Sequence, residues 1–212
     1  MIKIIIADDH QIVRAGLRQI ISDEPDLNVA GEADDGQELL EKIRKEPFDV
    51  ILLDISMPGR SGLEILKQIK GEKPGIPVLM LSTYPADQYA IRSMKAGAAG
   101  YINKKTLSDN LIEAIRKVHS GGKYITPEVA EIMAEMVVSD TPDMPHHSLS
   151  DREFQVLCMI ASGKMVSDIA RELFLSVKTV STYRTKILHK MNLKNSAELT
   201  HYVIKNHLLD NE

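Results

Sequence analysis

The sequence of 212 residues predicts a doubly wound α/β domain with a five-stranded parallel sheet, followed by a small all-α domain. The first observation is that short apolar runs alternate with amphipathic runs from Met1 to about Gly121, which is typical of repeated β/α units. The second is that apolar residues recur only at helical spacing from Leu149 onward. Five β/α units in series form a parallel sheet with right-handed crossovers.

The elements of the first domain follow from these runs. We expect strands at residues 3–7, 27–31, 50–54, 78–81 and 100–102. We expect helices at residues 11–21, 37–44, 63–70, 87–96 and 107–120. Turn sequences rich in Pro and Gly separate several of them, as at Met57-Pro58-Gly59 and Lys73-Pro74-Gly75. Thr106, three residues before Asp109, predicts an N-terminal cap for the fifth helix.

The middle of the chain reads as a connection. We expect a helix at residues 127–138, and a linker at 139–148 that is rich in Pro, His and Asp and has no periodicity. The predicted boundaries are therefore 1–121 for the first domain, 122–148 for the linker helix and linker, and 149–212 for the second domain. The pair His146-His147 could bind a metal, but few ligands lie nearby, so we expect solvated linker histidines.

The second domain reads as four helices, at about residues 150–161, 166–174, 178–191 and 195–206. Ser150 and Glu153 have the spacing of a capping box at the start of the first of these helices. Residues 175–177 leave only a tight turn between the second and third helices. Two helices joined by so short a turn form a helix-turn-helix.

Composition limits the functions that the chain can have. The net charge of −4 argues against a uniformly basic nucleic-acid binder, but residues 176–194 carry five Lys or Arg and no Asp or Glu. Cys158 is the single cysteine, which excludes an internal disulfide and argues against a zinc cluster. Because no apolar run approaches the roughly 18 residues of a membrane helix, and no signal-peptide pattern opens the chain, we expect a cytoplasmic protein.

Polar side chains follow four of the five predicted strands. Asp8 and Asp9 follow the first strand, and Asp54 ends the third. Ser82 and Lys104 follow the fourth and fifth. In an open parallel sheet these ends share one edge, where ligands bind. Three carboxylates that meet there repel one another unless a cation lies among them, and their oxygens suit Mg²⁺. The sequence therefore predicts a site that handles a phosphoryl group.

Each residue of this site has an expected role. Mg²⁺ would be held by the carboxylates of Asp8, Asp9 and Asp54 and by the backbone carbonyl of Ser56. Asp54 would also be the nucleophile that forms an acyl phosphate. The groups expected to bind the phosphoryl group and switch with it are Ser82, Thr83, Tyr101 and Lys104. The simpler alternative, that the acids only cap the following helices, explains Asp9 but not the whole set.

The helix at residues 178–191 has two faces. Val180, Ile187 and Met191 form an apolar stripe that should pack on Leu157, Ile169 and Leu173. The polar face would enter the major groove of DNA, and the remaining basic residues would contact phosphates. The expected DNA-binding residues are Lys178, Thr179, Ser181, Thr182, Tyr183, Arg184, Thr185, Lys186 and Lys190. The alternative is a solvated basic face without a ligand.

The last helix offers Leu199, Val203 and Ile204 on one side, where it could pair with a second copy of the chain. Such a dimer would place two recognition helices about one DNA turn apart, roughly 34 Å. The alternative is that these residues pack only within their own domain.

The two halves carry motifs of known families. Residues 1 to about 121 resemble a two-component receiver domain, in the stretches Ala7-Asp8-Asp9-His10, Leu53-Asp54-Ile55-Ser56-Met57-Pro58, Leu81-Ser82 and Gly100-Tyr101-Ile102-Asn103-Lys104. Residues 149–208 resemble the LuxR-type helix-turn-helix, in Leu149-Ser150-Asp151-Arg152-Glu153, Asp168-Ile169-Ala170 and Leu175-Ser176-Val177-Lys178-Thr179-Val180. Together they resemble a response regulator of the NarL/FixJ type.

That resemblance implies a flavodoxin-like receiver whose Asp54 accepts a phosphoryl group from a sensor histidine kinase. It further implies a homodimer when phosphorylated, binding to promoter DNA, and RNA polymerase as a candidate partner. Met165 departs from the family, which often has Ser or Thr there as a helix cap, at a cost of about 1 kcal/mol. An aspartyl phosphatase is a rival enzyme class, but its nucleophile would follow the first strand within Asp-x-Asp. A regulator gated by a ligand instead of phosphate is the other alternative.

Overall fold

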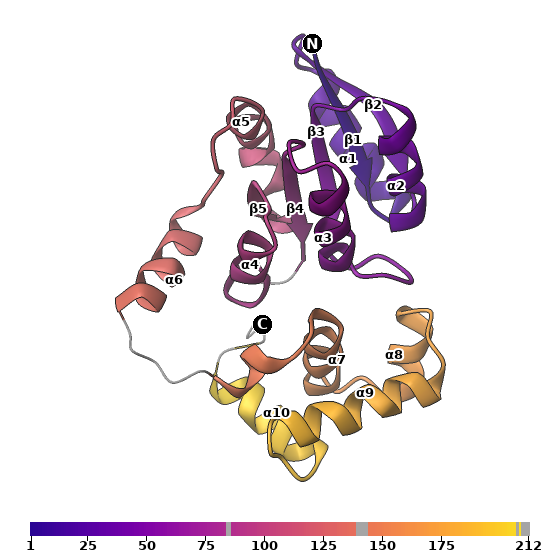
Figure 1. Cartoon of the computed structure of the whole chain (residues 1–212), viewed down its shortest axis with the longest axis vertical. Helices are drawn as coiled ribbons and strands as arrows, with labels where there is room; N and C mark the ends of the chain where they lie inside the picture. The colour runs from indigo at the N-terminus through magenta and orange to yellow at the C-terminus, as the bar shows by residue number, and fades with distance from the viewer. Residues whose placement is uncertain (84–85, 139–143, 207, 209–212) are drawn as a thin grey trace. The chain divides into compact units, whose positions relative to one another are not determined.

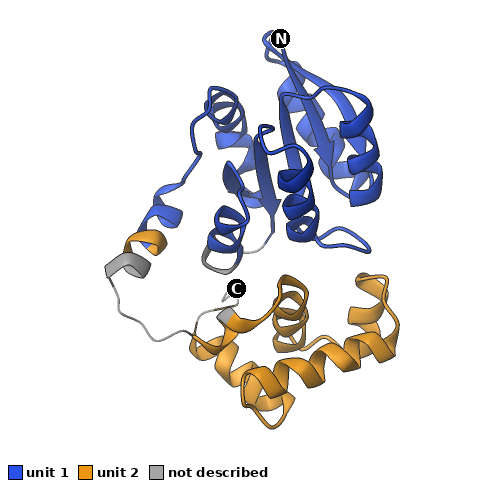
Figure 2. Ribbon diagram, in the orientation of Figure 1, with its two compact units in different colours: residues 1–131 blue, residues 132–212 orange. Residues whose placement is uncertain are grey.

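The computed structural model describes residues 1–83, 86–138, 144–206 and 208. Within this part the chain forms two compact units, Met1–Glu131 and Ile132–Glu212 (Figure 2). The division falls inside helix α6 (Pro127–Val138). The domain boundaries at 121 and 148 therefore stay a prediction, and residues 139–143 of the expected linker lie outside the described part. None of the described helices has both the length and the apolarity to cross a bilayer.

The first unit is the predicted α/β domain (Figure 1). Its five strands are all parallel, in the order β2-β1-β3-β4-β5. They are β1 (Ile2–Ala7), β2 (Leu27–Ala33), β3 (Val50–Asp54), β4 (Val78–Ser82) and β5 (Gly100–Asn103). The helices are α1 (Gln11–Ser22), α2 (Gly36–Lys45), α3 (Gly62–Glu72), α4 (Ala86–Lys95) and α5 (Leu107–His119). All five predicted strands and all five predicted helices are confirmed. Most of their ends differ from the predicted ends by one or two residues.

Burial explains why the middle strands are apolar on both faces. Every residue of β3 and β4 is buried, because helices cover both sides of the sheet. Helices α1 and α5 pack on one face, in a core that contains Leu17, Ile21, Leu111 and Ile115, and α2, α3 and α4 cover the other face (Figure 1). A strand enclosed in this way reads as a continuous apolar run.

A glycine lets α3 begin directly against the end of β3. Gly62 donates its backbone N–H to the carbonyl of Ile55 at 2.9 Å. A Cβ atom on Gly62 would lie 2.0 Å from the carbonyl oxygen of Asp54. The absence of a side chain at residue 62 therefore determines how closely α3 approaches Asp54.

The cap predicted for α5 is wrong. Thr106 precedes α5, but its side chain makes no capping hydrogen bond, and its hydroxyl donates instead to the carbonyl of Asn103 at 3.3 Å. The reason is a short 3-10 helix, η1 (Lys104–Thr106), between β5 and α5. Asn103 caps that turn by accepting from the backbone N–H of Lys105 at 2.9 Å.

The second unit contains the predicted four helices after a short 3-10 helix, η2 (Pro145–Ser148). They are α7 (Asp151–Ala161), α8 (Val166–Glu172), α9 (Val177–Lys190) and α10 (Ser196–Lys205). The capping box of Ser150 and Glu153 is confirmed, and Met165 precedes α8 without a side-chain cap, as expected. Helix α8 ends two residues before the predicted end, and Phe174 then adopts a left-handed φ of 53° that a helix does not continue through.

The core of this unit explains the stripe on α9. Val180 and Ile187 have no exposed surface, and Met191 is buried, as are Leu157, Ile169 and Leu173. Helix α9 contacts both α7 and α8, so the predicted packing of the stripe is confirmed.

The expectation of a solvated His146 is wrong. Its imidazole is buried, and its Nδ1 lies 2.8 Å from the hydroxyl of Tyr202 on α10. The residues before α7 thus pack against the last helix. A short 3-10 turn shows no hydrophobic periodicity, so this contact could not be predicted from the sequence.

Candidate functional site

The topology brings the acids of the first unit to one edge of the sheet. Asp8 follows β1, and Asp54 ends β3, which is the neighbour of β1 in the sheet. One ligand atom from each of Asp8, Asp9, His10 and Asp54 lies within 4.8 Å of all the others. The three carboxylates predicted to meet are therefore together.

Lys104 bridges two of these carboxylates from the end of β5. Its Nζ lies 2.6 Å from Oδ2 of Asp8 and 3.0 Å from Oδ1 of Asp54. Burial disfavours the ammonium, but the carboxylates of Asp54 and Asp8 outweigh burial and raise the pKa of Lys104 above its ordinary value. The lysine therefore stays charged and offsets part of the repulsion between the acids.

Asp54 is the most constrained of the acids. Its residue is 1% exposed, and this burial raises the pKa of its carboxyl to about 6, against the opposing effect of Lys104 and with the help of Asp8. The backbone N–H of Ser56 donates to the same carboxylate. The other oxygen, Oδ2, is buried and has no hydrogen-bond partner among the described residues.

An orphaned carboxylate oxygen is evidence that a cation fits. Leaving a buried acceptor without a partner costs about 1–3 kcal/mol, more for a charged group. Oxygen donors from three carboxylates form the ligand set that Mg²⁺ prefers. The residues present thus fit a divalent ion, which would give the orphaned oxygen a partner.

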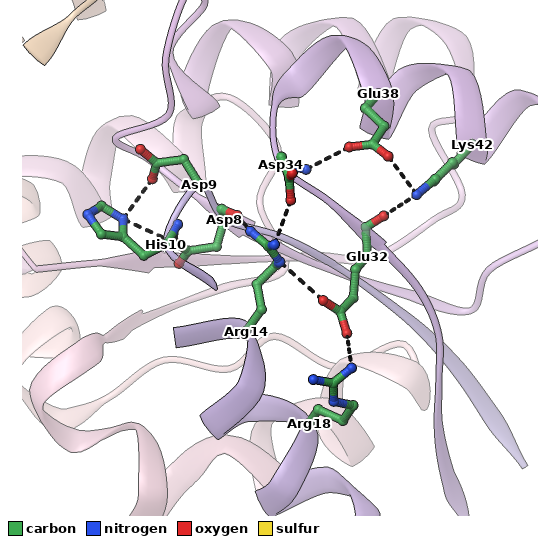
Figure 3. A network of polar contacts seen from close by, with 9 residues as sticks. All are labelled: Asp8, Asp9, His10, Arg14, Arg18, Glu32, Asp34, Glu38 and Lys42. Atoms are coloured by element: carbon green, nitrogen blue, oxygen red, sulfur yellow. Dashed lines mark hydrogen bonds and ion pairs between the residues drawn. The ribbon is translucent and has the colours of Figure 1, made fainter. Parts of the chain in front are cut away.

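A buried arginine, which sequence reasoning missed, holds the Asp8 backbone in place (Figure 3). Arg14 on α1 donates from Nη1 to the backbone carbonyl of Asp8 at 2.6 Å. The same guanidinium pairs with Glu32 at 3.1 Å and with Asp34 at 2.6 Å. It therefore ties the end of β1 to β2 and to the residue that follows it. The only signal in the sequence was the position of Arg14, which lies one turn before Leu17 on the apolar side of an amphipathic helix.

The other predicted switch residues lie at the same edge of the sheet. Ser82 ends β4 and Tyr101 lies in β5, and both are buried. Thr83 is exposed. Their roles toward a phosphoryl group stay predictions, as does the metal contact of the Ser56 carbonyl.

The second candidate site lies on α9. A hollow in the surface is lined by Ser176, Lys178, Thr179, Thr182, Tyr183 and Lys186. Five of these six residues were predicted to contact DNA, and their helical spacing places them on one face. Ser181 and Thr185 are exposed on the same helix, and each lies one turn from another of the predicted contacts.

Two basic residues among the predicted DNA contacts also have side-chain partners on other helices of the unit. Lys190 pairs with the capping carboxylate of Glu153 at 2.6 Å. Arg184 donates from Nε to the hydroxyl of Ser196 at 2.8 Å. Both residues support the packing of α9, whatever else they contact.

The predicted dimer residues are divided between core and surface. Leu199 and Val203 on α10 have no exposed surface, and α10 contacts α7. Ile204 is 57% exposed. A pairing of α10 with a second copy would therefore use Ile204, and it stays a prediction.

The comparisons with known proteins agree with both halves. Residues 4–116 match the response regulator receiver domain family, and residues 147–203 match the LuxR family of bacterial regulatory proteins. The chain is 38% identical to the response regulator UvrY of Escherichia coli, over all of this chain and 98% of the relative. It is also 38% identical to the oxygen regulatory protein NreC of Staphylococcus carnosus, over 98% of this chain and 99% of the relative.

Solved structures are similar over the same length. The RcsB response regulator of Salmonella typhimurium aligns with a TM-score of 0.63 and 27% identity, over 96% of this chain and 99% of that one. RcsB from Salmonella enterica serovar Typhimurium, bound to the promoter rprA in the presence of the phosphomimetic BeF3−, aligns with a TM-score of 0.65 and 25% identity. That match covers 95% of this chain and 97% of the other.

Proposed function

The chain belongs to the two-component response regulators that join a receiver domain to a LuxR-type DNA-binding domain, and from that membership we propose that phosphorylation of Asp54 controls its binding to promoter DNA. The phosphodonor would be a sensor histidine kinase. The observation that carries the proposal is the buried Asp54 carboxylate, which has an orphaned oxygen and lies beside Asp8 and Lys104.

The chemistry would run at the Asp54 carboxylate. A carboxylate oxygen attacks the phosphorus, the bond between phosphorus and the donor nitrogen of phosphohistidine breaks, and an acyl phosphate forms. The donor imidazole leaves with the electron pair of that bond and takes up a proton. Mg²⁺, held by Asp8, Asp9, Asp54 and the Ser56 carbonyl, would supply positive charge against the phosphoryl oxygens. The phosphoryl group ends on the chain itself, so we propose no turnover of an external substrate.

Lys104 would have a second task once the phosphoryl group is attached. Its ammonium now pairs with Asp54, and a phosphorylated Asp54 no longer offers that carboxylate oxygen as a free anion. The ammonium would then pair with a phosphoryl oxygen. Ser82 and Thr83 would donate hydroxyl hydrogen bonds to the same oxygens, and Tyr101 would occupy space that Ser82 vacates.

The output would be DNA binding through α9. The hollow that contains Lys178, Thr182 and Lys186 faces solvent without an acid in its lining. The hydroxyl and lysine side chains there fit a DNA backbone and base edges. Dimerisation on phosphorylation would bring two such helices to neighbouring half-sites. The structure of RcsB on a promoter with a phosphomimetic supports this proposal by analogy.

The test is intact mass and solution oligomeric state after incubation with acetyl phosphate and Mg²⁺. We expect one phosphoryl adduct on the wild type, none on Asp54→Ala, and a shift of the wild type toward dimer. Asp109→Ala, which removes an exposed acid at the start of α5, is the matched control and should be labelled like the wild type.

An unlabelled wild type, under conditions where another receiver domain reacts, would contradict the proposal. A regulator gated by a ligand would then be the better hypothesis. Continuous release of phosphate from a small phosphoester would instead support the phosphatase alternative.

A further inference from the structure

Three helices of the second unit, α7, α8 and α9, end in the same backbone motif. In each, a residue with a left-handed φ follows the helix: Gly163 at 81°, Phe174 at 53° and Asn192 at 53°. The next residue then donates its backbone N–H to a carbonyl five residues earlier, as Leu175 does to Ala170 at 2.8 Å after α8. This is the Schellman motif, whose left-handed position usually holds Gly and sometimes Asn. A phenylalanine in that position is the exception.

Phe174 lowers the stability of the fold in two ways. A bulky side chain disfavours a left-handed backbone, which Gly adopts freely. The ring is also 72% exposed, so packing within the unit offsets little of that strain. Helices α4 and α5 of the first unit end in the same motif with Gly97 and Gly121. A strained and exposed aromatic residue is therefore a candidate for contact with a ligand.

Phe174 lies beside the hollow on α9. It is two residues before Ser176, and two residues span at most about 7 Å. Ser176 lines the hollow and caps α9 by accepting from the backbone N–H of Thr179 at 3.0 Å. Val177, the first residue of α9, is 53% exposed. The apolar surface of Phe174 and Val177 is thus continuous with the hollow that we propose to bind DNA.

The charges around this turn suit a polyanion. Arg171 pairs with Asp168 at 3.4 Å, but its side chain is still 80% exposed. Lys178 is exposed in the lining of the hollow. Between these two cations the sequence has a single acid, Glu172, which pairs with Lys164 at 2.6 Å. A phosphate backbone therefore meets cations here, and no unpaired carboxylate between Arg171 and Lys178.

We propose that the Phe174 ring contacts DNA by packing against the deoxyribose of a backbone strand beside the groove that α9 enters. The inference rests on the proposed function, because it takes α9 as the helix that binds DNA. It goes further in assigning an apolar contact to the turn before that helix. The simpler arrangement, in which Phe174 is an exposed residue without a ligand, predicts that its ring can be removed with no loss of affinity.

The test measures the stability of the fold and the affinity for DNA separately. The full chain is incubated with acetyl phosphate and Mg²⁺, and its binding to a labelled mixed-sequence duplex is measured by fluorescence anisotropy at several salt concentrations. Urea denaturation with pulsed hydrogen exchange gives the stability of the second unit. The variants are Phe174→Gly, and Phe174→Tyr, which keeps the ring. The matched control is Asn192→Gly, which has the same φ and motif but lies at the other end of α9, about 21 Å along its 14 residues.

We expect Phe174→Gly to raise the urea midpoint of the second unit, because Gly removes the backbone strain. The same variant should weaken binding to the duplex about fivefold or more, as the loss of a partly buried ring would. The slope of log affinity against log salt concentration should not change, because no cation is removed. Phe174→Tyr should bind within about twofold of the wild type, since the aromatic ring remains. Asn192→Gly should bind as the wild type does.

The inference is overturned if Phe174→Gly binds the duplex as the wild type does, if it lowers the urea midpoint, or if Asn192→Gly loses the same affinity. Unchanged binding of Phe174→Gly would direct the search for a ligand of the ring to partner proteins. A wild type that binds no duplex would overturn the proposed function together with this inference. A wild type that binds, beside a Phe174→Gly variant that binds equally, overturns this inference alone, so the two failures are distinguishable.

Discussion

The two units form their polar sites in opposite ways. In the first unit, residues far apart in the sequence meet at the ends of β1, β3 and β5, and two of the acids are at most 1% exposed. In the second unit, the residues of the hollow lie within one turn and one helix, at the surface. Charges in the first site are therefore coupled to folding, because burial and repulsion must be balanced there. The charges of the hollow, on Lys178 and Lys186, are exposed and are not coupled to folding in this way, so substitutions in the two sites should differ in their effect on stability.

The largest effect should come from a residue without charge, Gly62. Gly62→Ala would place a Cβ 2.0 Å from the carbonyl oxygen of Asp54, so the start of α3 or the end of β3 must move. We expect a loss of about 3 kcal/mol or more in the free energy of unfolding of the first unit. Labelling of Asp54 by acetyl phosphate should fall with it. Urea denaturation with pulsed hydrogen exchange would report the two units separately.

Gly71→Ala in the same helix is the control. No atom lies within 4 Å of a Cβ built on Gly71, so the substitution should be neutral or should stabilise α3 by up to about 1 kcal/mol. If Gly62→Ala unfolds at the same urea concentration as Gly71→Ala, the close approach of α3 does not position Asp54.

The next effect compares two lysines, one from each site. Lys104→Met removes the ammonium between Asp8 and Asp54, and breaking a buried pair costs about 3–5 kcal/mol. Lys104 lowers the pKa of Asp54, so its removal would raise that pKa above the present value of about 6 and let the carboxyl take up a proton; we therefore expect a smaller loss of about 2–3 kcal/mol at pH 7. Lys186→Met on α9 removes an exposed ammonium and should change stability by less than about 0.5 kcal/mol.

Added Mg²⁺ sharpens this comparison. If a cation occupies the space among the acids, millimolar Mg²⁺ should raise the stability of Lys104→Met more than that of the wild type, because it replaces the missing positive charge. The Lys186→Met variant should respond as the wild type does. Equal losses of stability in both variants without Mg²⁺ would remove the distinction between a coupled and an uncoupled site.

The same contrast explains which parts of the molecule could be predicted from sequence. Periodicity and turn residues were sufficient for all five strands, most of which are local apolar runs that the helices bury. The rule that parallel strand ends share an edge then brought Asp8, Asp54 and Lys104 together. The face of α9 followed from helical spacing alone.

The errors came from contacts that no local pattern encodes. His146 was expected in solvent, but its partner Tyr202 is 56 residues away in the sequence. Arg14 binds the Asp8 carbonyl, a backbone atom that no side-chain motif can point to. Thr106 had the spacing of a cap, but η1 moved the cap to Asn103. Long-range polar contacts and short 3-10 turns were thus the features that sequence reasoning could not reach.

A smaller effect on stability is expected from the ion pair of Glu153 and Lys190, at 2.6 Å. Burial alone would raise the pKa of Glu153, but hydrogen bonds from Lys190 and Ser150 outweigh it and hold that pKa below the ordinary value of 4.5. A carboxyl with a depressed pKa stabilises the fold above its unfolded pKa, and this contribution is lost as the pH falls through the folded value. Glu153→Gln keeps a capping oxygen and should cost about 0.5–1 kcal/mol at pH 7, because Lys190 is partly exposed. The difference from the wild type should shrink below about pH 4.5 and would contradict the assignment if it were constant with pH.

The smallest change in stability is expected for Lys186→Met, which should nevertheless weaken DNA binding clearly. This prediction compares Lys186 with Lys190 on the same helix. Lys186 lines the hollow, whereas Lys190 pairs with Glu153. Each phosphate contact adds about one to the slope of log affinity against log salt concentration. Binding to a labelled mixed-sequence duplex, measured by fluorescence anisotropy at several salt concentrations, should therefore lose about one from that slope in Lys186→Met. In Lys190→Met the slope should stay as in the wild type, while stability falls by about 0.5–1 kcal/mol. Equal slope losses in both variants would mean that Lys190 leaves Glu153 to bind phosphate, and that the second site, like the first, uses charges on which its fold depends.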